Sequence, residues 1–244
     1  KLTNLDYLCR IMQKNISVIL SSPISSQSLK KVLLGYNAQT YRNFEVIIAV
    51  ASTSNEINNL INAIRDKVFY TIKQFSSNIN ECLFTNNLIN EIATNYIVFA
   101  NGNSIPRFDF IEQHFKNREE GFFLSGEYNS ISQEIFEKIS EENINSGDCF
   151  ELSWLKRNGN KNIFSDVFRY SKGLLGSFLN MLLKVNVKLN AENSSVWKDD
   201  LILILQHKNN LLDVAFFQEL TSILRANNIK GRQMKYSAIL LQQK

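Results

Sequence analysis

The feature that most constrains the fold is an alternation of short β-branched runs with amphipathic segments. Compact runs rich in β-branched and other apolar residues predict buried strands at residues 16–20, 46–50 and 96–100, with a shorter strand at 68–72. Apolar residues at helical spacing predict helices over residues 25–37, 56–67 and 80–94. The loops between these segments are short. This order predicts an α/β protein with a mostly parallel central sheet flanked by helices.

Each of three predicted strands is followed by a polar turn. The turns are Ser21–Ser25, Val50–Asn55 and Asn101–Ser104. Parallel strands end at the same edge of a sheet, and ligands in such sheets bind outside the carboxyl ends of the strands. The topology therefore predicts a binding site built from these three turns.

The second half of the chain is less regular. Helices are expected at residues 108–116, 131–142 and 213–226, and a strand is expected at 121–125. Residues 143–170 read as a loop-rich stretch, while 172–188 fit either one helix or a helix followed by a strand. A short helix is expected over residues 4–13. The chain lacks an internal repeat and a clear linker, so we expect one domain spanning residues 1–244.

Composition narrows the functional classes. The 244 residues are 44% hydrophobic and carry a formal net charge of +4, an excess too small to argue for nucleic acid. Cys9, Cys82 and Cys149 lack metal or redox spacing, which favours a reducing compartment. The first residues do not resemble a signal peptide, and no apolar run reaches the roughly 18 residues of a membrane span. We therefore expect a cytoplasmic protein.

Five segments together resemble family 2 glycosyltransferases, which have the GT-A fold. The match begins with the strand at 16–20 and the phrase Gln-Thr-Tyr-Arg-Asn-Phe-Glu-Val-Ile-Ile at 39–48. It continues through residues 93–106, 193–201 and 212–231. The resemblance implies transfer of a sugar from a nucleotide-sugar donor to a glycan or lipid-linked acceptor, in surface polysaccharide synthesis. Separately, the segment Tyr170–Lys188 mixes Lys and Leu, which fits either a peripheral contact with the inner face of the membrane or an ordinary core helix.

The resemblance assigns the candidate site residues and two halves of the domain. Residues 15–105 would form the nucleotide-sugar-binding half, and 106–244 the acceptor-side half. Asp213 matches the catalytic base, Asn103 a metal ligand and Trp197 an acceptor-side aromatic residue. The residues expected to bind the nucleotide sugar are Ser21, Ser22, Ala51, Ser52, Asn87 and Asn101.

The sequence departs from the family at its acidic positions. Val50 and Ala51 stand where the family places an Asp pair that contacts the nucleotide, and Asn101 and Asn103 replace the Asp-x-Asp metal motif. Inverting transfer needs a cation such as Mg²⁺ or Mn²⁺ at the departing diphosphate and a carboxylate base at the acceptor hydroxyl. Amide oxygens coordinate cations without the charge that dominates affinity. The metal motif is therefore degenerate, and the two residues that would bind Mg²⁺ or Mn²⁺ here, Asn101 and Asn103, are both uncharged.

Two functions stay open from the sequence. One is an active glycosyltransferase that uses Asp213 as its base, with weak metal ligands or no metal. The other is a catalytically inactive relative that binds a sugar, a nucleotide or a partner enzyme. Several candidate residues also have an ordinary structural explanation: Asn101–Asn103 as a turn, Asp213 and Ser52 as helix caps, and Trp197 as core packing. A dinucleotide-binding enzyme is disfavoured, because the first strand lacks a glycine fingerprint.

Overall fold

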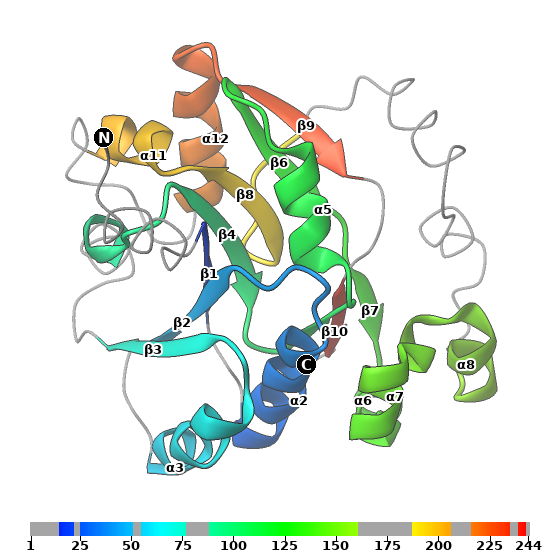
Figure 1. The fold of residues 1–244 in the computed structure, drawn as a ribbon. Coiled ribbons are helices and arrows are strands. Elements are labelled where there is room, and N and C mark those ends of the chain that lie inside the picture. Colours follow the sequence, from blue (N-terminus) through cyan, green and yellow to red (C-terminus); the bar gives the residue numbers. More distant parts are fainter. Residues whose placement is uncertain are drawn as a thin grey trace, which may run out of the picture.

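The computed structural model describes residues 15–21, 25–50, 55–76, 88–160, 187–205, 216–234 and 239–242. Its main feature is a seven-stranded sheet with the strand order β3-β2-β1-β4-β8-β6-β9 (Figure 1). The strands are β1 (Ile16–Ser21), β2 (Phe44–Val50), β3 (Thr71–Ser76), β4 (Tyr96–Asn101), β6 (Phe122–Gly126), β8 (Asn193–Trp197) and β9 (Lys230–Met234).

The first four strands form the parallel half of the sheet. β1 lies between β2 and β4, and Ile16 of β1 is opposite Phe44 of β2 and Tyr96 of β4. β3 extends the sheet beyond β2 in the same direction. The side chains of Ile16–Leu20 are buried, as expected for a strand covered on both faces. The predicted parallel α/β arrangement is confirmed.

The remaining strands make the sheet mixed. β8 is antiparallel to both β4 and β6, whereas β6 and β9 are parallel to each other. The direction of β8 is therefore opposite to that of every other strand in the sheet. This reversal decides which residues of β8 lie at the candidate site.

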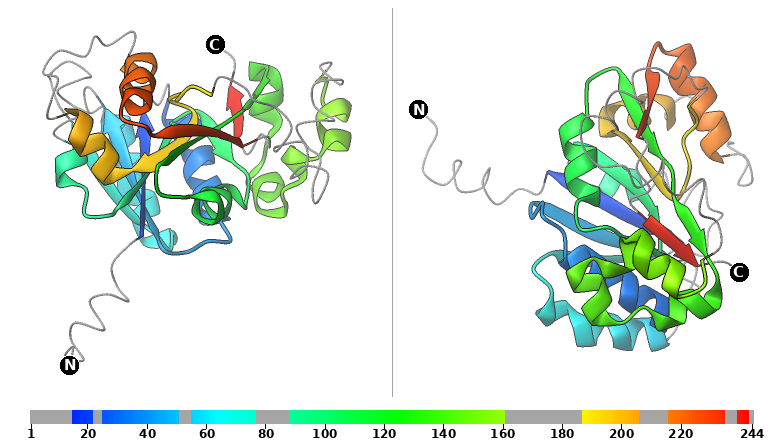
Figure 2. Two further views of the ribbon diagram at one scale, coloured as in Figure 1. Left: turned by 90° about the horizontal axis from the view of Figure 1, so that it is seen from above. Right: turned by 90° about the vertical axis from the view of Figure 1, so that its right-hand side faces the viewer.

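Helices cover both faces of the sheet, and each face has its own hydrophobic core (Figures 1 and 2). One core packs beneath α2 (Ser26–Asn37), α3 (Asn55–Ile64), α5 (Phe110–Asn117), α6 (Gln133–Lys138), α7 (Glu141–Ser146) and α8 (Leu152–Arg157). The opposite core packs beneath α11 (Lys198–Leu205) and α12 (Phe216–Ala226), with residues 88–92. Among the described residues, no helix has the length and apolar character needed to cross a membrane.

A second, three-stranded sheet has the order β5-β10-β7. β5 (Ser104–Pro106) follows β4 almost directly, β7 is Asn129–Ile131, and β10 is Ile239–Gln242. The strand β5 was not anticipated from the sequence. It carries the chain away from the end of the main sheet and leads into α5.

Several expected boundaries were wrong. The third strand runs over Thr71–Ser76 rather than 68–72, because residues 65–67 form a 3₁₀ helix, η1 (Arg65–Lys67), and Tyr70 stacks on Phe44 instead. The helix expected at 131–142 is split, since Ser140 caps a new helix through a capping box with Asn143. Described residues 143–160 are mostly helical, including η2 (Asp148–Phe150), rather than loop-rich.

Three other expected segments lie largely or wholly outside the described residues. They are the leading helix at 4–13, the first part of the helix at 80–94, and most of residues 172–188. The helix expected at 213–226 is confirmed from Phe216 onward.

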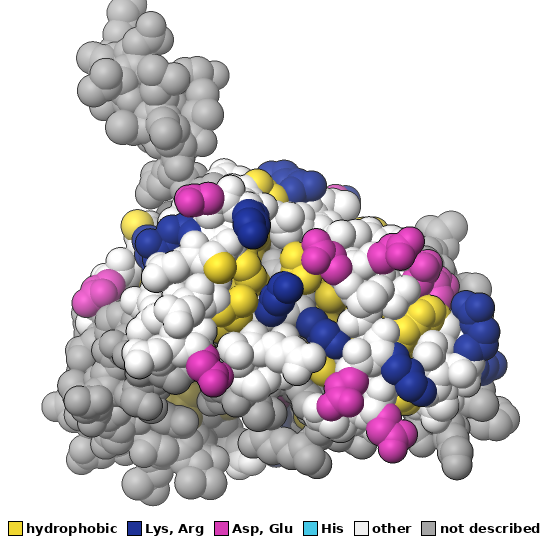
Figure 3. All heavy atoms as spheres, turned by 90° about the horizontal axis from the view of Figure 1, so that it is seen from below, with side chains coloured by type: hydrophobic (Ala, Val, Ile, Leu, Met, Phe, Trp, Pro, Cys, Tyr) yellow, Lys and Arg dark blue, Asp and Glu magenta, His cyan; other side chains and the backbone are white. Residues whose placement is uncertain are grey.

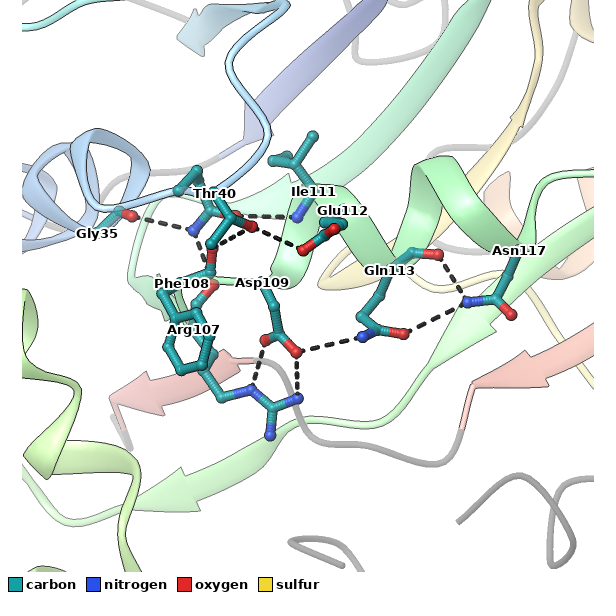
Figure 4. Close-up of polar contacts among 10 residues, drawn as sticks. Gly35, Thr40, Arg107, Phe108, Asp109, Ile111, Glu112, Gln113 and Asn117 are labelled. Atoms are coloured by element: carbon teal, nitrogen blue, oxygen red, sulfur yellow. Dashed lines mark hydrogen bonds and ion pairs between the residues drawn. The ribbon is translucent and has the colours of Figure 1, made fainter. Parts of the chain in front are cut away.

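Gln39, in the phrase at 39–48, joins α2 to α5. Its amide nitrogen donates to the carbonyl oxygens of Gly35 (3.0 Å) and Arg107 (2.7 Å), and its amide oxygen accepts from the backbone N–H of Ile111 (2.9 Å) (Figure 4). The side chain is fully buried. Thr40 adds a hydrogen bond to Glu112 of α5 at 2.9 Å. The phrase thus fixes the position of the helix that follows β5.

Candidate functional site

The carboxyl ends of β1, β2 and β4 meet at one edge of the sheet. Ser21 of β1 is opposite Ala49 of β2 on one side and Asn101 of β4 on the other. The backbone N–H of Gly102 donates to the carbonyl oxygen of Ser21 at 2.7 Å, which ties the turn after β4 to the end of β1. The chain passes from β1 to β2 on one side, and β4 lies on the other. The carboxyl ends of β1 and β4 therefore flank the topological switch point, where ligands bind in this class of sheet.

The side chains at this edge share one face. Residues two apart in a strand lie on the same face, so Ser21 and Asn101 lie on the face of Ile19 and Phe99, which belong to the core beneath α12. Both Ser21 and Asn101 are partly exposed. The other expected nucleotide-sugar-binding residues, Ser22, Ala51, Ser52 and Asn87, and the expected base Asp213, lie outside the described residues.

The turn after β4 is held by its two asparagines. The amide oxygen of Asn101 accepts from the backbone N–H of Asn103 at 2.9 Å and from the side-chain amide of Asn103 at 3.0 Å. Asn103 itself is only 2% exposed. This is a side-chain turn of the kind that asparagine forms readily. The structure therefore brings Asn101 and Asn103 together, but in contact with each other.

This donor set does not suit a divalent cation. Mg²⁺ and Mn²⁺ prefer carboxylate oxygens, and here two neutral amides stand at the position that the resemblance gives to the metal motif. The oxygen of Asn101 already accepts two hydrogen bonds. Among the residues that the structure describes, no cluster of three or more His, Cys, Asp or Glu residues could hold an ion.

Strands β6 and β8 bring further residues to the same edge, which the sequence did not single out. β8 begins at Asn193, directly opposite Ala100, and β6 ends at Gly126. Asn190 donates to the carbonyl oxygen of Gly126 at 3.1 Å and accepts from the backbone N–H of Asn193 at 2.6 Å. The loop before β8 is thereby held against the end of β6, next to the turn after β4.

Glu192 places a carboxyl group in this loop. Glu192 directly precedes Asn193, the first residue of β8, which pairs with Ala100 of β4. Burial raises the pKa of the Glu192 carboxyl, although hydrogen bonds from the backbone of Glu192 and Ala191 counteract part of that increase. Burial, with a smaller contribution from Glu192, also raises the pKa of nearby Tyr128. A carboxyl group of raised pKa beside the switch point is a candidate for proton transfer.

A buried chain of hydrogen bonds links Asn193 to His114, Ser195 and Tyr96. The side-chain amide of Asn193 donates to the carbonyl oxygen of Glu127 at 2.8 Å, so its oxygen faces Nε2 of His114, 3.0 Å away. That oxygen can only accept, so Nε2 carries the proton and Nδ1 accepts from the hydroxyl of Ser195 at 2.7 Å. The hydroxyl of Tyr96 then donates to Ser195 at 2.8 Å. The chain sets one tautomer of His114, and burial lowers the pKa of His114 to about 3.

Trp197 does not lie at this edge. Because β8 is antiparallel to β4, Trp197 pairs with Tyr96 at the amino end of β4, whereas Asn193 pairs with Ala100 at the other end. The indole N–H of Trp197 donates to the carbonyl oxygen of Glu119 at 3.0 Å, and its ring packs edge-on against Tyr96. The structure therefore gives Trp197 a packing role at the opposite end of the sheet from the switch point.

The surface seen from below has mixed charge. In Figure 3, Lys and Arg side chains alternate with Asp and Glu side chains, and the hydrophobic side chains between them form several separate spots. Elsewhere a described cation is held against an aromatic ring, since Arg42 lies over Phe69 at 4.0 Å. This face therefore does not have the single-sign character of a polyanion-binding surface.

Comparison with known proteins identifies the fold. The sequence matches no protein-family model and no curated protein. Among solved structures, the mannosyltransferase PcManGT from Pyrobaculum calidifontis, in complex with GDP-Man and Mn²⁺, has a TM-score of 0.58 and 9% identity, covering 95% of this chain and 57% of that one. S. aureus TarS 1-349 in complex with UDP-GlcNAc has a TM-score of 0.57 and 11% identity, covering 94% and 59%.

A further structure of S. aureus TarS gives a TM-score of 0.59 at 12% identity and covers 94% of this chain and 37% of that one. This chain thus spans less than two thirds of each of these proteins. At such identities the likeness shows the fold alone. The chain has the GT-A fold, with a mixed central sheet flanked by helices.

Proposed function

We propose that this GT-A-fold chain binds a nucleotide-sugar donor at the switch point between β1 and β4 and transfers the sugar to a glycan or lipid-linked acceptor. The observation that carries the proposal is the pairing of Ser21 with Asn101, which places two polar strand ends at that point. The structural neighbours support it, because one was solved with GDP-Man and another with UDP-GlcNAc. Surface polysaccharide synthesis, as a divergent family 2 enzyme, is part of the same proposal.

In this proposal residues 15–105 bind the donor and residues 106–244 form the acceptor side. Two carboxylates are candidates for the base that takes the acceptor proton. Asp213 is the one that the resemblance implies, and Glu192 is the one that directly precedes Asn193, the partner of Ala100 in β4. An inverting reaction needs one such base to act while the nucleotide diphosphate departs.

A second function is favoured by a specific observation. At the position of the Asp-x-Asp motif stand two neutral asparagines that are hydrogen-bonded to each other. A relative that binds a nucleotide or sugar without turnover would keep the strand ends and lose the carboxylates in this way. The two functions share donor binding and differ in turnover.

Calorimetric titration with UDP, GDP and their sugar derivatives tests donor binding. Asn101→Trp should abolish binding, because the large ring would fill the switch point. Asn95→Trp is the matched control, since Asn95 is exposed at the amino end of β4 and should leave binding unchanged. Absence of binding in the unaltered chain, or equal loss in both variants, would contradict the proposed site. A second assay then distinguishes the two functions. An enzyme should release UDP or GDP when acceptor is present, whereas a protein that only binds the donor should not.

A further inference from the structure

The orientation of the two asparagine side chains at the switch point follows from their contacts. The backbone N–H of Asn103 can only donate, so the Asn101 atom that it contacts at 2.9 Å is the amide oxygen. The Asn103 side-chain atom that lies 3.0 Å from the same oxygen must then be the nitrogen, because two amide oxygens would repel at that distance. Both hydrogen bonds therefore converge on one oxygen.

A cation approaching this oxygen meets two unfavourable conditions. Both lone pairs of the oxygen are directed at N–H groups, whose positive ends would face the ion. Asn103 is 2% exposed, so its side chain cannot turn toward solvent without losing its buried position. Neither residue offers the negative charge that gives a carboxylate site most of its affinity.

We infer that the turn Asn101–Asn103 is closed to divalent cations, and that nucleotide diphosphates bind at this edge without a bridging metal ion. The second part rests on the proposed function. The amide nitrogen of Asn103 donates to the amide oxygen of Asn101, so a hydrogen bond joins these two side chains where a cation would join two carboxylates. Two neutral amides also do not repel a diphosphate, whereas two free carboxylates would do so unless a cation lay between them.

Electron paramagnetic resonance of Mn²⁺ tests the turn without any nucleotide. The spectrum of free Mn²⁺ should be unchanged by the unaltered chain, while the double variant Asn101→Asp, Asn103→Asp should bind Mn²⁺ with a dissociation constant of about 1 mM or lower. Asn59→Asp with Asn62→Asp adds the same charge on exposed positions of α3 and should not bind.

Uptake of Mn²⁺ by the unaltered chain that disappears in Asn101→Ala would overturn the inference. Failure of the double aspartate variant to bind Mn²⁺ would overturn it as well. The two amides in place of carboxylates would then not be the reason why this turn binds no cation.

Calorimetry with UDP and GDP, in EDTA and in Mn²⁺, tests the second part. The dissociation constants in the two conditions should agree within about twofold, and a tenfold or larger weakening in EDTA, about 1.4 kcal/mol, would overturn metal-independent binding. That result would leave the proposed function intact. Absence of binding in both conditions would instead overturn the proposed function and, with it, metal-independent nucleotide binding, while the Mn²⁺ spectra would still decide whether the turn is closed.

Discussion

Asn193 occupies the space that any side chain at position 126 would need. A Cβ built on Gly126 would lie 2.2 Å from Nδ2 of Asn193. Gly126→Ala should therefore displace Asn193 and lower the free energy of unfolding by about 1–3 kcal/mol, the usual cost of overpacking. Denaturant unfolding measures this change.

The collision can be isolated in a double-mutant cycle. In an Asn193→Ala background the added methyl group has room, so Gly126→Ala should cost much less there. Equal costs in both backgrounds would show that Asn193 is not what excludes a side chain at Gly126.

His114 should make folding stability depend on pH. Burial lowers its pKa to about 3 in the folded chain, whereas an unfolded histidine titrates near 6.5. Above pH 6.5 both states are neutral and the effect is absent. Between pH 6.5 and 3 only the unfolded state binds the proton, so the free energy of unfolding falls by about 1.4 kcal/mol per pH unit.

The comparison variant is His114→Gln, which removes this titration. The difference in unfolding free energy between the unaltered chain and His114→Gln should be constant above pH 7 and should shrink from pH 6.5 to 5. A difference that stays constant across that range would mean that His114 titrates normally in the folded state.

Gln39 should be among the most important polar residues for stability. Gln39→Met keeps the approximate size of the side chain but leaves the buried carbonyl of Gly35 and the N–H of Ile111 without the partner that Gln39 supplies, while the carbonyl of Arg107 keeps the N–H of Phe110. At about 1–3 kcal/mol for each unsatisfied group, a loss of about 2 kcal/mol or more in unfolding free energy is expected. Gln133→Met, at an exposed position in α6, should change stability by less than about 0.5 kcal/mol. Similar losses in both variants would argue against a special role for the hydrogen bonds of Gln39 between α2 and α5.

Glu192 should affect turnover more than donor binding if it is the base. Glu192→Gln should then lower kcat by about 10²–10⁴-fold and leave the dissociation constant for the nucleotide sugar within about twofold. Because burial raises the pKa of Glu192, the acidic limb of the pH–rate profile should lie above the ordinary glutamate value and should vanish in the variant. Asp213→Asn is the parallel test, and a full loss of turnover there with normal Glu192→Gln kinetics would assign the base to Asp213.

The sequence predicted the parallel half of the fold because its signals are local. The run Ile16–Leu20 is mostly β-branched and apolar and is buried on both faces, and it is followed by a helix with a serine cap at Ser25, whose hydroxyl accepts from the N–H of Ser28 at 3.1 Å. Such a unit strongly favours a right-handed crossover to a parallel neighbour, and consecutive strands are usually adjacent, which predicts β1 next to β2, as observed. The same rules place the ends of the parallel strands at one edge, but the pairing of Ser21 with Asn101 also needs β4 beside β1, which is a long-range contact.

The position of Trp197 shows what the sequence could not supply. The segment Asn193–Trp197 reads equally well as a strand in either direction, and only the long-range pairing with β4 and β6 decides which end reaches the site. The antiparallel direction places Asn193 and the neighbouring Glu192 at the site and moves Trp197 to the far end. The contact between His114 and Ser195 joins residues 81 positions apart and has no local signal either.

Photochemical crosslinking with azido derivatives of UDP and GDP, followed by peptide mapping, tests the central claim most directly. Labelling is predicted in the segments 21–25, 50–55 or 101–104, and it should be lost in Asn101→Trp but kept in Asn95→Trp. Labelling confined to the amino end of the sheet, around Tyr96 and Trp197, or no labelling by either derivative, would contradict a nucleotide site between β1 and β4.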